Sequence, residues 1–260
     1  MSPEAIDAAA RALVAARAAH RVIAGLDPAC RPRTVAEGYA VQRRFRELWP
    51  GQIAGWKVGA TARPIMQRFG IDEPMLGPFY AADVYASPAR PAASGFRHLC
   101  LETEFTFRFG RDLPPRSAPY ARPEIVAAVD AVVPSFELIN PRYERIPFDS
   151  VAEAIADCGL NGGMVLGAPI GDWHALDLVG HKVRLVVDGM VKGEGTGALA
   201  LDDPVNVLEW AVNTLGRNGV GIASGQHIAT GTMTGVVYVE AGQTAVGDFG
   251  SLGSIEVRFV

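Results

Sequence analysis

The segment Leu101-Glu102-Thr103-Glu104-Phe105-Thr106-Phe107 places two acidic side chains inside an apolar and aromatic run. β-Branched and aromatic residues favour a strand there. Side chains of a strand alternate between its faces, so Glu102 and Glu104 share one face and Phe105 and Phe107 lie behind them. Two carboxylates about 7 Å apart repel each other unless a positive group lies between them. Mg²⁺ or Mn²⁺ would serve, because both prefer oxygen ligands; the alternative is a solvated strand face.

The composition is that of a globular protein with a large core. The chain has 260 residues, of which 49% are hydrophobic and 20% are charged. Its net charge of −4 gives no electrostatic case for nucleic-acid binding. No stretch approaches the roughly 18 apolar residues that span a bilayer, and no secretory segment is recognisable. We therefore expect a cytoplasmic protein in which Cys30, Cys100 and Cys158 are reduced packing residues.

Helical patterns dominate the first part of the chain. We expect helices over residues 3–25 and 34–48, the second with a capping box from Thr34 to Glu37. A short strand over 53–59 and a short helix within 61–74 follow. Later helices are expected over 123–129, 148–157 (capped by Asp149) and 204–216.

Short β-rich runs dominate after about residue 76. The expected strands cover residues 101–109, 133–140, 163–168, 181–188, 190–194, 227–230, 235–239 and 254–260. Asp188-Gly189 indicates a hairpin turn. No regular alternation of strands and helices and no glycine-rich phosphate loop is present. The pattern predicts an α+β protein with an N-terminal helical region (1–75) and a β-rich catalytic region (76–260), folded as one compact unit.

Two further charges lie in apolar strand-like segments. Lys57 stands in Gly55-Trp56-Lys57-Val58-Gly59, and Glu137 is the only charge in residues 132–140. Lysine is rarely buried without a partner, and burial would make its ammonium group lose a proton more readily, as an acid/base catalyst requires. The alternative for Lys57 is an edge-strand residue. Glu137 could pair with Lys57 or Arg142, or could be a third oxygen ligand beside Glu102 and Glu104.

The run Ser224 to Gly235 is rich in glycine and threonine. Its glycines would let the backbone approach a ligand closely, and its threonine hydroxyls could bind a carboxylate. A plain turn between strands is equally compatible with this composition. His227 is interpreted as a structural histidine.

Several segments together resemble the 2-keto-4-pentenoate hydratase family, which includes 2-oxohept-4-ene-1,7-dioate hydratases and 4-oxalocrotonate decarboxylases and belongs to the fumarylacetoacetate hydrolase superfamily. Their order and spacing along nearly the whole chain carry the resemblance. They are Thr34–Gln42, Gly55–Gly59, Asp72–Gly77, Leu101–Phe105, Phe136–Ile139 and Gly162–Gly167.

The resemblance implies a mixed β-roll fold with a small N-terminal helical region, a homo-oligomer, and a bound Mg²⁺ or Mn²⁺ ion. At matching positions, Glu102, Glu104 and Glu137 would be the metal ligands and Lys57 the catalytic lysine. The substrate-binding positions would be Thr230, Gly231, Thr232 and Leu76.

The activity implied is that of a lyase in aromatic meta-cleavage catabolism, which adds water to a short 2-hydroxy-dienoate or 2-oxo-alkenoate. The alternatives are decarboxylation of 4-oxalocrotonate or 2-oxo-3-hexenedioate, then acylpyruvate hydrolysis, then a non-catalytic oxo-acid-binding homologue. Met75 stands where many hydratases carry an acid, which weakens the hydratase assignment. A dicarboxylate would need a cationic contact, for which Arg63, Arg68 and Arg142 are candidates.

Overall fold

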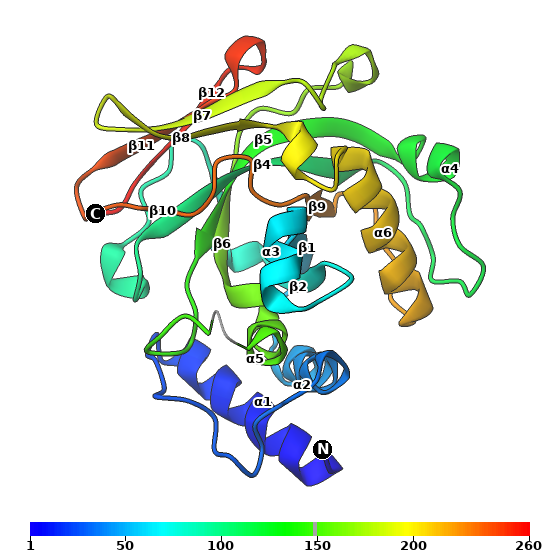
Figure 1. Cartoon of the computed structure of the whole chain (residues 1–260), viewed down its shortest axis with the longest axis vertical. Coiled ribbons are helices and arrows are strands. Elements are labelled where there is room, and N and C mark those ends of the chain that lie inside the picture. Colours follow the sequence, from blue (N-terminus) through cyan, green and yellow to red (C-terminus); the bar gives the residue numbers. More distant parts are fainter. Residues whose placement is uncertain (148–149) are drawn as a thin grey trace.

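The computed structural model describes residues 1–147 and 150–260 (Figure 1). The helices are α1 (Pro3–Ala18), α2 (Val35–Leu48), α3 (Arg63–Phe69), α4 (Arg122–Val126), α5 (Val151–Ala156) and α6 (Pro204–Arg217). The strands are β1 (Ile53–Gly59), β2 (Met75–Tyr80), β3 (Val84–Ala86), β4 (Cys100–Phe109), β5 (Val129–Ile139), β6 (Asn161–Leu166), β7 (Lys182–Val187), β8 (Met190–Thr196), β9 (His227–Ala229), β10 (Val237–Tyr238), β11 (Thr244–Asp248) and β12 (Ser254–Arg258).

Two sheets form the body of the molecule. The larger has the order β2-β1-β9-β4-β5-β6-β3, with β10 paired to β4, and the smaller has the order β12-β11-β7-β8. Figure 1 shows the smaller sheet lying across β4 and β5, and α1, α2 and α5 gathered at the opposite end of the molecule. The main core fills the space between the sheets, where Phe105 contacts Phe249 and Phe107 contacts Trp173.

The expected alternation along β4 is present and separates a core face from a site face. Phe105, Phe107 and Phe109 are fully buried in the main core. Glu102 and Glu104 project from the other side of the strand. Burying three phenylalanine side chains contributes roughly 1.5–3 kcal/mol each, so the aromatic face fixes which way the carboxylates point.

The N-terminal helices agree with the sequence in type but not in every boundary. α2 begins with the predicted capping box, in which Thr34 Oγ1 accepts from the Glu37 amide and the Glu37 carboxylate accepts from the Thr34 amide. The helix predicted over 3–25 ends at Ala18, because His20 takes a positive φ of 49° and the chain turns so that Ile23 bridges to Tyr143. Helix propensity, which is a local property, could not predict the contact between Ile23 and Tyr143.

Three strands were absent from the sequence expectations. β2, β3 and β11 are short, and β2 contains Gly77 and Pro78, which are poor strand formers. β2 nevertheless pairs with β1 along its length. The start of the predicted helix over 148–157 and its proposed cap Asp149 lie outside the described residues. In the described part of the chain, Ser150 caps α5.

The proposed boundary between residues 75 and 76 falls inside β2. β1, which precedes the boundary, pairs with β2 on one side and with β9 on the other. These hydrogen bonds join both parts of the chain in one sheet, and the two-region division stays a prediction. None of the helices in the described part of the chain has the length and apolar character needed to cross a bilayer.

A buried ion pair ties the end of β5 to the segment after α5. Arg142 Nε lies 2.5 Å from Asp157 Oδ1, and both side chains are buried. The Arg142 guanidinium also donates to the backbone oxygens of Asp157 and Asn161. Arg142 is therefore fully engaged and does not pair with Glu137.

We expect Arg142→Met to lower the free energy of unfolding by about 3–5 kcal/mol, because it leaves the Asp157 carboxylate buried without its partner. Urea denaturation measures this loss. Arg184→Met is the matched control: its side chain is 55% exposed and pairs with Asp248, so its loss should stay below about 1 kcal/mol. Equal losses in the two variants would contradict the assignment.

Candidate active site

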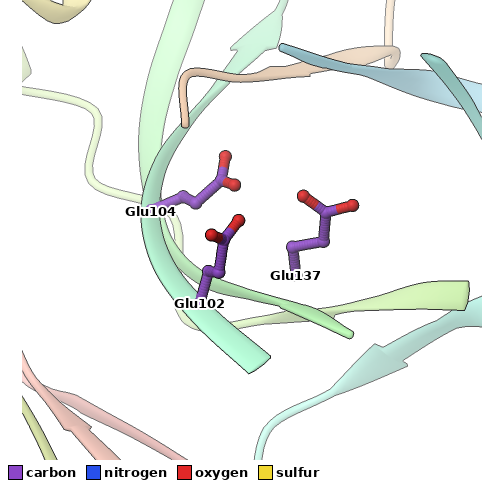
Figure 2. Close-up of side chains that lie close together, drawn as sticks. All are labelled: Glu102, Glu104 and Glu137. Atoms are coloured by element: carbon purple, nitrogen blue, oxygen red, sulfur yellow. The ribbon is translucent and has the colours of Figure 1, made fainter. Parts of the chain in front are cut away.

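Three carboxylates converge on one point from two neighbouring strands. Glu102 and Glu104 project from β4, and Glu137 projects from β5, where it lies directly opposite Glu102 in the antiparallel register. Figure 2 shows all three side chains directed into a common space. One oxygen from each of them lies within 4.8 Å of the others. Glu104 and Glu137 are fully buried.

Neighbouring segments hold Glu104 and Glu137 in place. Glu104 Oε2 accepts from the Gly231 amide at 2.8 Å, and Glu137 Oε1 accepts from Asn161 Nδ2 at 3.1 Å. Among the described residues, no group donates to the buried Glu104 Oε1. A buried carboxylate oxygen without a donor is costly, and a cation in the common space would satisfy it.

Burial and repulsion between the carboxylates shift the pKa values of Glu102 and Glu104 upward. Burial, followed by the Glu137 charge, raises the pKa of Glu102 to about 7. Burial and the charges of Glu137 and Glu102 raise the pKa of Glu104 well above its usual range. The trio is thus destabilised as three free anions, which is the condition that a divalent cation relieves.

Lys57 is the cation nearest to the trio. Its Nζ lies 3.3 Å from Glu137 Oε2, and its side chain is buried. Burial alone would lower the pKa of Lys57, but the three carboxylates, with Glu137 foremost, outweigh it and raise that pKa. The expectation that burial would release the proton more readily is therefore wrong for the chain alone, since the neighbouring charges retain the ammonium form.

A cleft of about 410 Å³ opens beside the trio. Glu102, Lys57, Gly231 and Thr232 line its inner end, so the structure brings together these sequence-predicted residues. The volume lies within the range of about 300–1,000 Å³ that is typical of small-molecule sites.

Two of the proposed substrate-binding residues, Thr230 and Leu76, do not line the cleft. Thr230 is buried, and its Oγ1 donates to the backbone oxygen of Phe105. Leu76 packs in the main core, and its backbone oxygen accepts from Gln42. His227 is half-buried at the start of β9 and does not line the cleft.

Gly231 needs to be glycine for two reasons. Its φ of 92° is strained for other residues, and a Cβ atom there would lie 2.2 Å from Thr61 Oγ1. The glycine lets the backbone turn so that its amide reaches Glu104. The segment around Gly231 therefore contacts the carboxylate trio directly through its backbone.

Asn161 is a site residue that the sequence did not reveal. Its side chain is fully buried and donates to Glu137, while its backbone oxygen accepts from Arg142. It follows a turn in which Cys158, Gly159 and Leu160 all have positive φ values, from 54° to 68°. Non-glycine residues in that region cost of order 1 kcal/mol each, so surrounding contacts must hold the turn. No local sequence signal predicts a contact made across such a turn.

The chain is similar to known proteins along most of its length. The chain is 30% identical to a 4-oxalocrotonate decarboxylase from Pseudomonas putida, over 87% of this chain and 86% of the relative. It is 28% identical to a 2-keto-4-pentenoate hydratase from Paraburkholderia xenovorans, over 100% of this chain and 96% of the relative. No protein-family model matches the chain.

Solved structures show the same fold. The 4-oxalocrotonate decarboxylase from Pseudomonas putida G7, complexed with magnesium and adipate, superposes with a TM-score of 0.89 at 27% identity and covers 100% of this chain and 99% of its own. A fumarylacetoacetate hydrolase family protein from Yersinia pestis superposes with a TM-score of 0.61 at 12% identity, over 82% of this chain and 95% of its own. At this identity the similarity shows the fold alone. The predicted α+β fold of the fumarylacetoacetate hydrolase type is confirmed.

Removal of the Asn161 donor should weaken cation binding without unfolding the chain. We expect Asn161→Leu to reduce Mn²⁺ affinity about 10- to 100-fold, because Glu137 loses the hydrogen bond that orients it. Isothermal titration calorimetry with Mn²⁺ measures the affinity, and the unfolding temperature of the metal-free variant reports on the fold.

Asn213→Leu is the matched control, since Asn213 on α6 bonds the Tyr120 backbone and contacts no member of the trio. Asn161→Ala repeats the test with a smaller side chain. Mn²⁺ affinity within twofold of the parent in either folded Asn161 variant would refute the positioning role.

Proposed function

The chain belongs to the family of 2-keto-4-pentenoate hydratases and 4-oxalocrotonate decarboxylases, and on this premise we propose that it is a metal-dependent hydratase of 2-hydroxy-dienoic acids. The observation that carries the proposal is the trio of buried carboxylates with Lys57 at the inner end of the cleft. An acid of this type would enter the cleft with its carboxylate and C2 oxygen directed toward the trio.

The donor set fits Mg²⁺ or Mn²⁺. Glu102, Glu104 and Glu137 offer oxygen atoms only, and no histidine or cysteine belongs to the cluster found among the described residues. Hard divalent cations prefer such ligands, and three carboxylates leave coordination positions for water and substrate. When bound, the ion supplies Lewis-acid polarisation of the substrate's C2 oxygen.

Lys57 is suited to hold and move a proton. Hydration of a 2-hydroxy-2,4-dienoate first moves a proton from the enol oxygen to C5, and water then adds its oxygen at C4 and its hydrogen at C3. Lys57 Nζ would donate the proton and recover it, because the carboxylates keep it in the ammonium form beside the cleft. The apolar cleft walls would exclude other water from the reacting atoms.

The remaining expectations concern the state of the protein in the cell. Assembly into a homo-oligomer, a cytoplasmic location and the lack of nucleic-acid and membrane partners stay predictions. Light scattering of the purified protein measures the first of these directly.

Loss of one carboxylate should abolish metal-dependent turnover. We expect Glu104→Gln to reduce kcat for hydration of 2-hydroxypenta-2,4-dienoate by about a hundredfold or more, since the ion loses a charged ligand while the amide oxygen can still accept from Gly231. Ultraviolet absorbance of the dienoate follows the reaction. Chelation should likewise stop the parent enzyme, and Mg²⁺ should restore it.

Glu194→Gln is the matched control, because Glu194 lies exposed on β8 in the smaller sheet. It should retain full activity. Undiminished turnover by Glu104→Gln, or by the parent enzyme under chelation, would count against a metal-dependent reaction.

Decarboxylation of an unsaturated 2-oxo diacid is the second candidate function. Met75 lies in the cleft wall, and a Cβ atom on Gly59 would touch both its Cε and Lys57 Nζ. The titratable residues that line the described part of the cleft are Lys57, Glu102 and Arg68. Loss of CO₂ breaks the C5–C6 bond of the diacid and leaves a dienolate that takes up one proton. Hydration in addition needs a proton taken from water, so the small number of titratable groups favours decarboxylation.

Release of CO₂ separates the two functions. Incubation with 2-oxo-3-hexenedioate and Mg²⁺ should release CO₂ if the second candidate is correct, and 2-hydroxypenta-2,4-dienoate should then remain unconsumed. Hydration of the dienoate without CO₂ release from the diacid supports the hydratase.

A further inference from the structure

The three arginines that the sequence offers for a distal carboxylate have different environments. Arg142 is buried in its pair with Asp157. Arg63 pairs with Asp202 on the surface, at 2.5 Å between Nη2 and Oδ2. Arg68 lines the cleft and has no hydrogen-bond or ion-pair partner within residues 1–147 and 150–260. Among these three, and as far as the described residues show, Arg68 alone offers an unpaired charge to a ligand.

Helix α3 directs this charge toward the cleft. Ile65, Arg68 and Phe69 follow the i, i+3, i+4 spacing of one helix face, and all three line the cleft. None of the residues of α3 is buried, so this face meets the cleft and not a packed core. Figure 1 places α3 in front of β1 and β2, beside the strand that carries Lys57.

The inner cation of the cleft is already compensated. Lys57 lies 3.3 Å from Glu137 and is surrounded by three carboxylates. Lys57 is therefore not available to pair with a substrate carboxylate that lies far from the trio. Arg68 is the other cation among the described residues that line the cleft.

The walls between the inner end and α3 are apolar. Met75, Ile139, Ala154 and Leu160 belong to one hydrophobic cluster, and all four line the cleft. A carboxylate placed against such a surface loses hydration and needs a cation in compensation, whereas a methyl group would be accommodated without one. A contact with Arg68 would therefore decide whether the cleft binds a distal carboxylate or a distal methyl group.

We propose that Arg68 is a specificity-determining residue that binds the distal carboxylate of a 2-oxo diacid whose 2-oxo acid end lies at the carboxylate trio. The assignment rests on the proposed function, because the trio must first fix the other end of the substrate. The planar guanidinium can donate two parallel hydrogen bonds to a carboxylate. Both the hydratase and the decarboxylase readings accept such a diacid.

Two saturated six-carbon acids isolate the distal group. 2-Oxoadipate and 2-oxohexanoate share the 2-oxo acid end and differ only in a terminal carboxylate or methyl group. Isothermal titration calorimetry in Mg²⁺ should show about fivefold tighter binding of 2-oxoadipate to the parent protein, the strength expected of a partly exposed ion pair. The preference should shrink as salt is added.

Arg68→Met should weaken 2-oxoadipate binding about fivefold and leave 2-oxohexanoate within twofold of the parent. Arg63→Met is the matched control from the same helix and should change neither affinity, since Arg63 is paired with Asp202. Both residues are exposed, so both variants should fold.

A parent protein that prefers 2-oxohexanoate, or an Arg68→Met variant that keeps the preference for the diacid, would overturn the role of Arg68 while leaving the proposed function in place. Failure of both acids to bind in a Mg²⁺-dependent manner would overturn the proposed function, and with it the assignment of Arg68.

Discussion

Repulsion among three buried carboxylates is the constraint on which the site depends. The antiparallel register of β4 and β5 sets Glu102 opposite Glu137, and Glu104 lies on the same face one step along. Like charges at opposed positions destabilise a sheet. Burial, followed by repulsion from the neighbouring carboxylates, raises the pKa values of Glu102 and Glu104. Without a ligand, proton uptake relieves this repulsion; a divalent cation is the ligand whose charge and chemistry fit the three carboxylates.

The same strand supplies the stability that holds these groups together. Its other face carries the buried phenylalanines that pack against the smaller sheet, so β4 cannot shift its register by one residue without moving them into the site. Gly231 then holds Glu104, and Asn161 and Lys57 hold Glu137, from three other segments. A site assembled in this way is rigid because each of its members also belongs to the packed framework.

Charged groups are distributed unevenly along the cleft. The inner end combines anionic oxygens with an ammonium group, which suits recognition of a 2-oxo acid and movement of a proton. The walls are apolar, and Arg68 stands on α3 among exposed apolar residues. On the proposed assignments, different residues would govern the reaction type and the choice of substrate.

The sequence by itself determined the strand that carries Glu102 and Glu104, their shared face, the capped helix α2 and the resemblance to the family, because these depend on local periodicity and on ordered motifs. It named Glu137 and Lys57 as lone charges in apolar strands but left their partners open. Only the tertiary structure decided that the carboxylates raise the pKa of Lys57, that Arg142 pairs with Asp157, that Asn161 holds Glu137, and that Arg68 and not Arg63 lines the cleft. These outcomes depend on which distant segments meet, and no spacing along the chain encodes the distance between two side chains that arrive from separate strands.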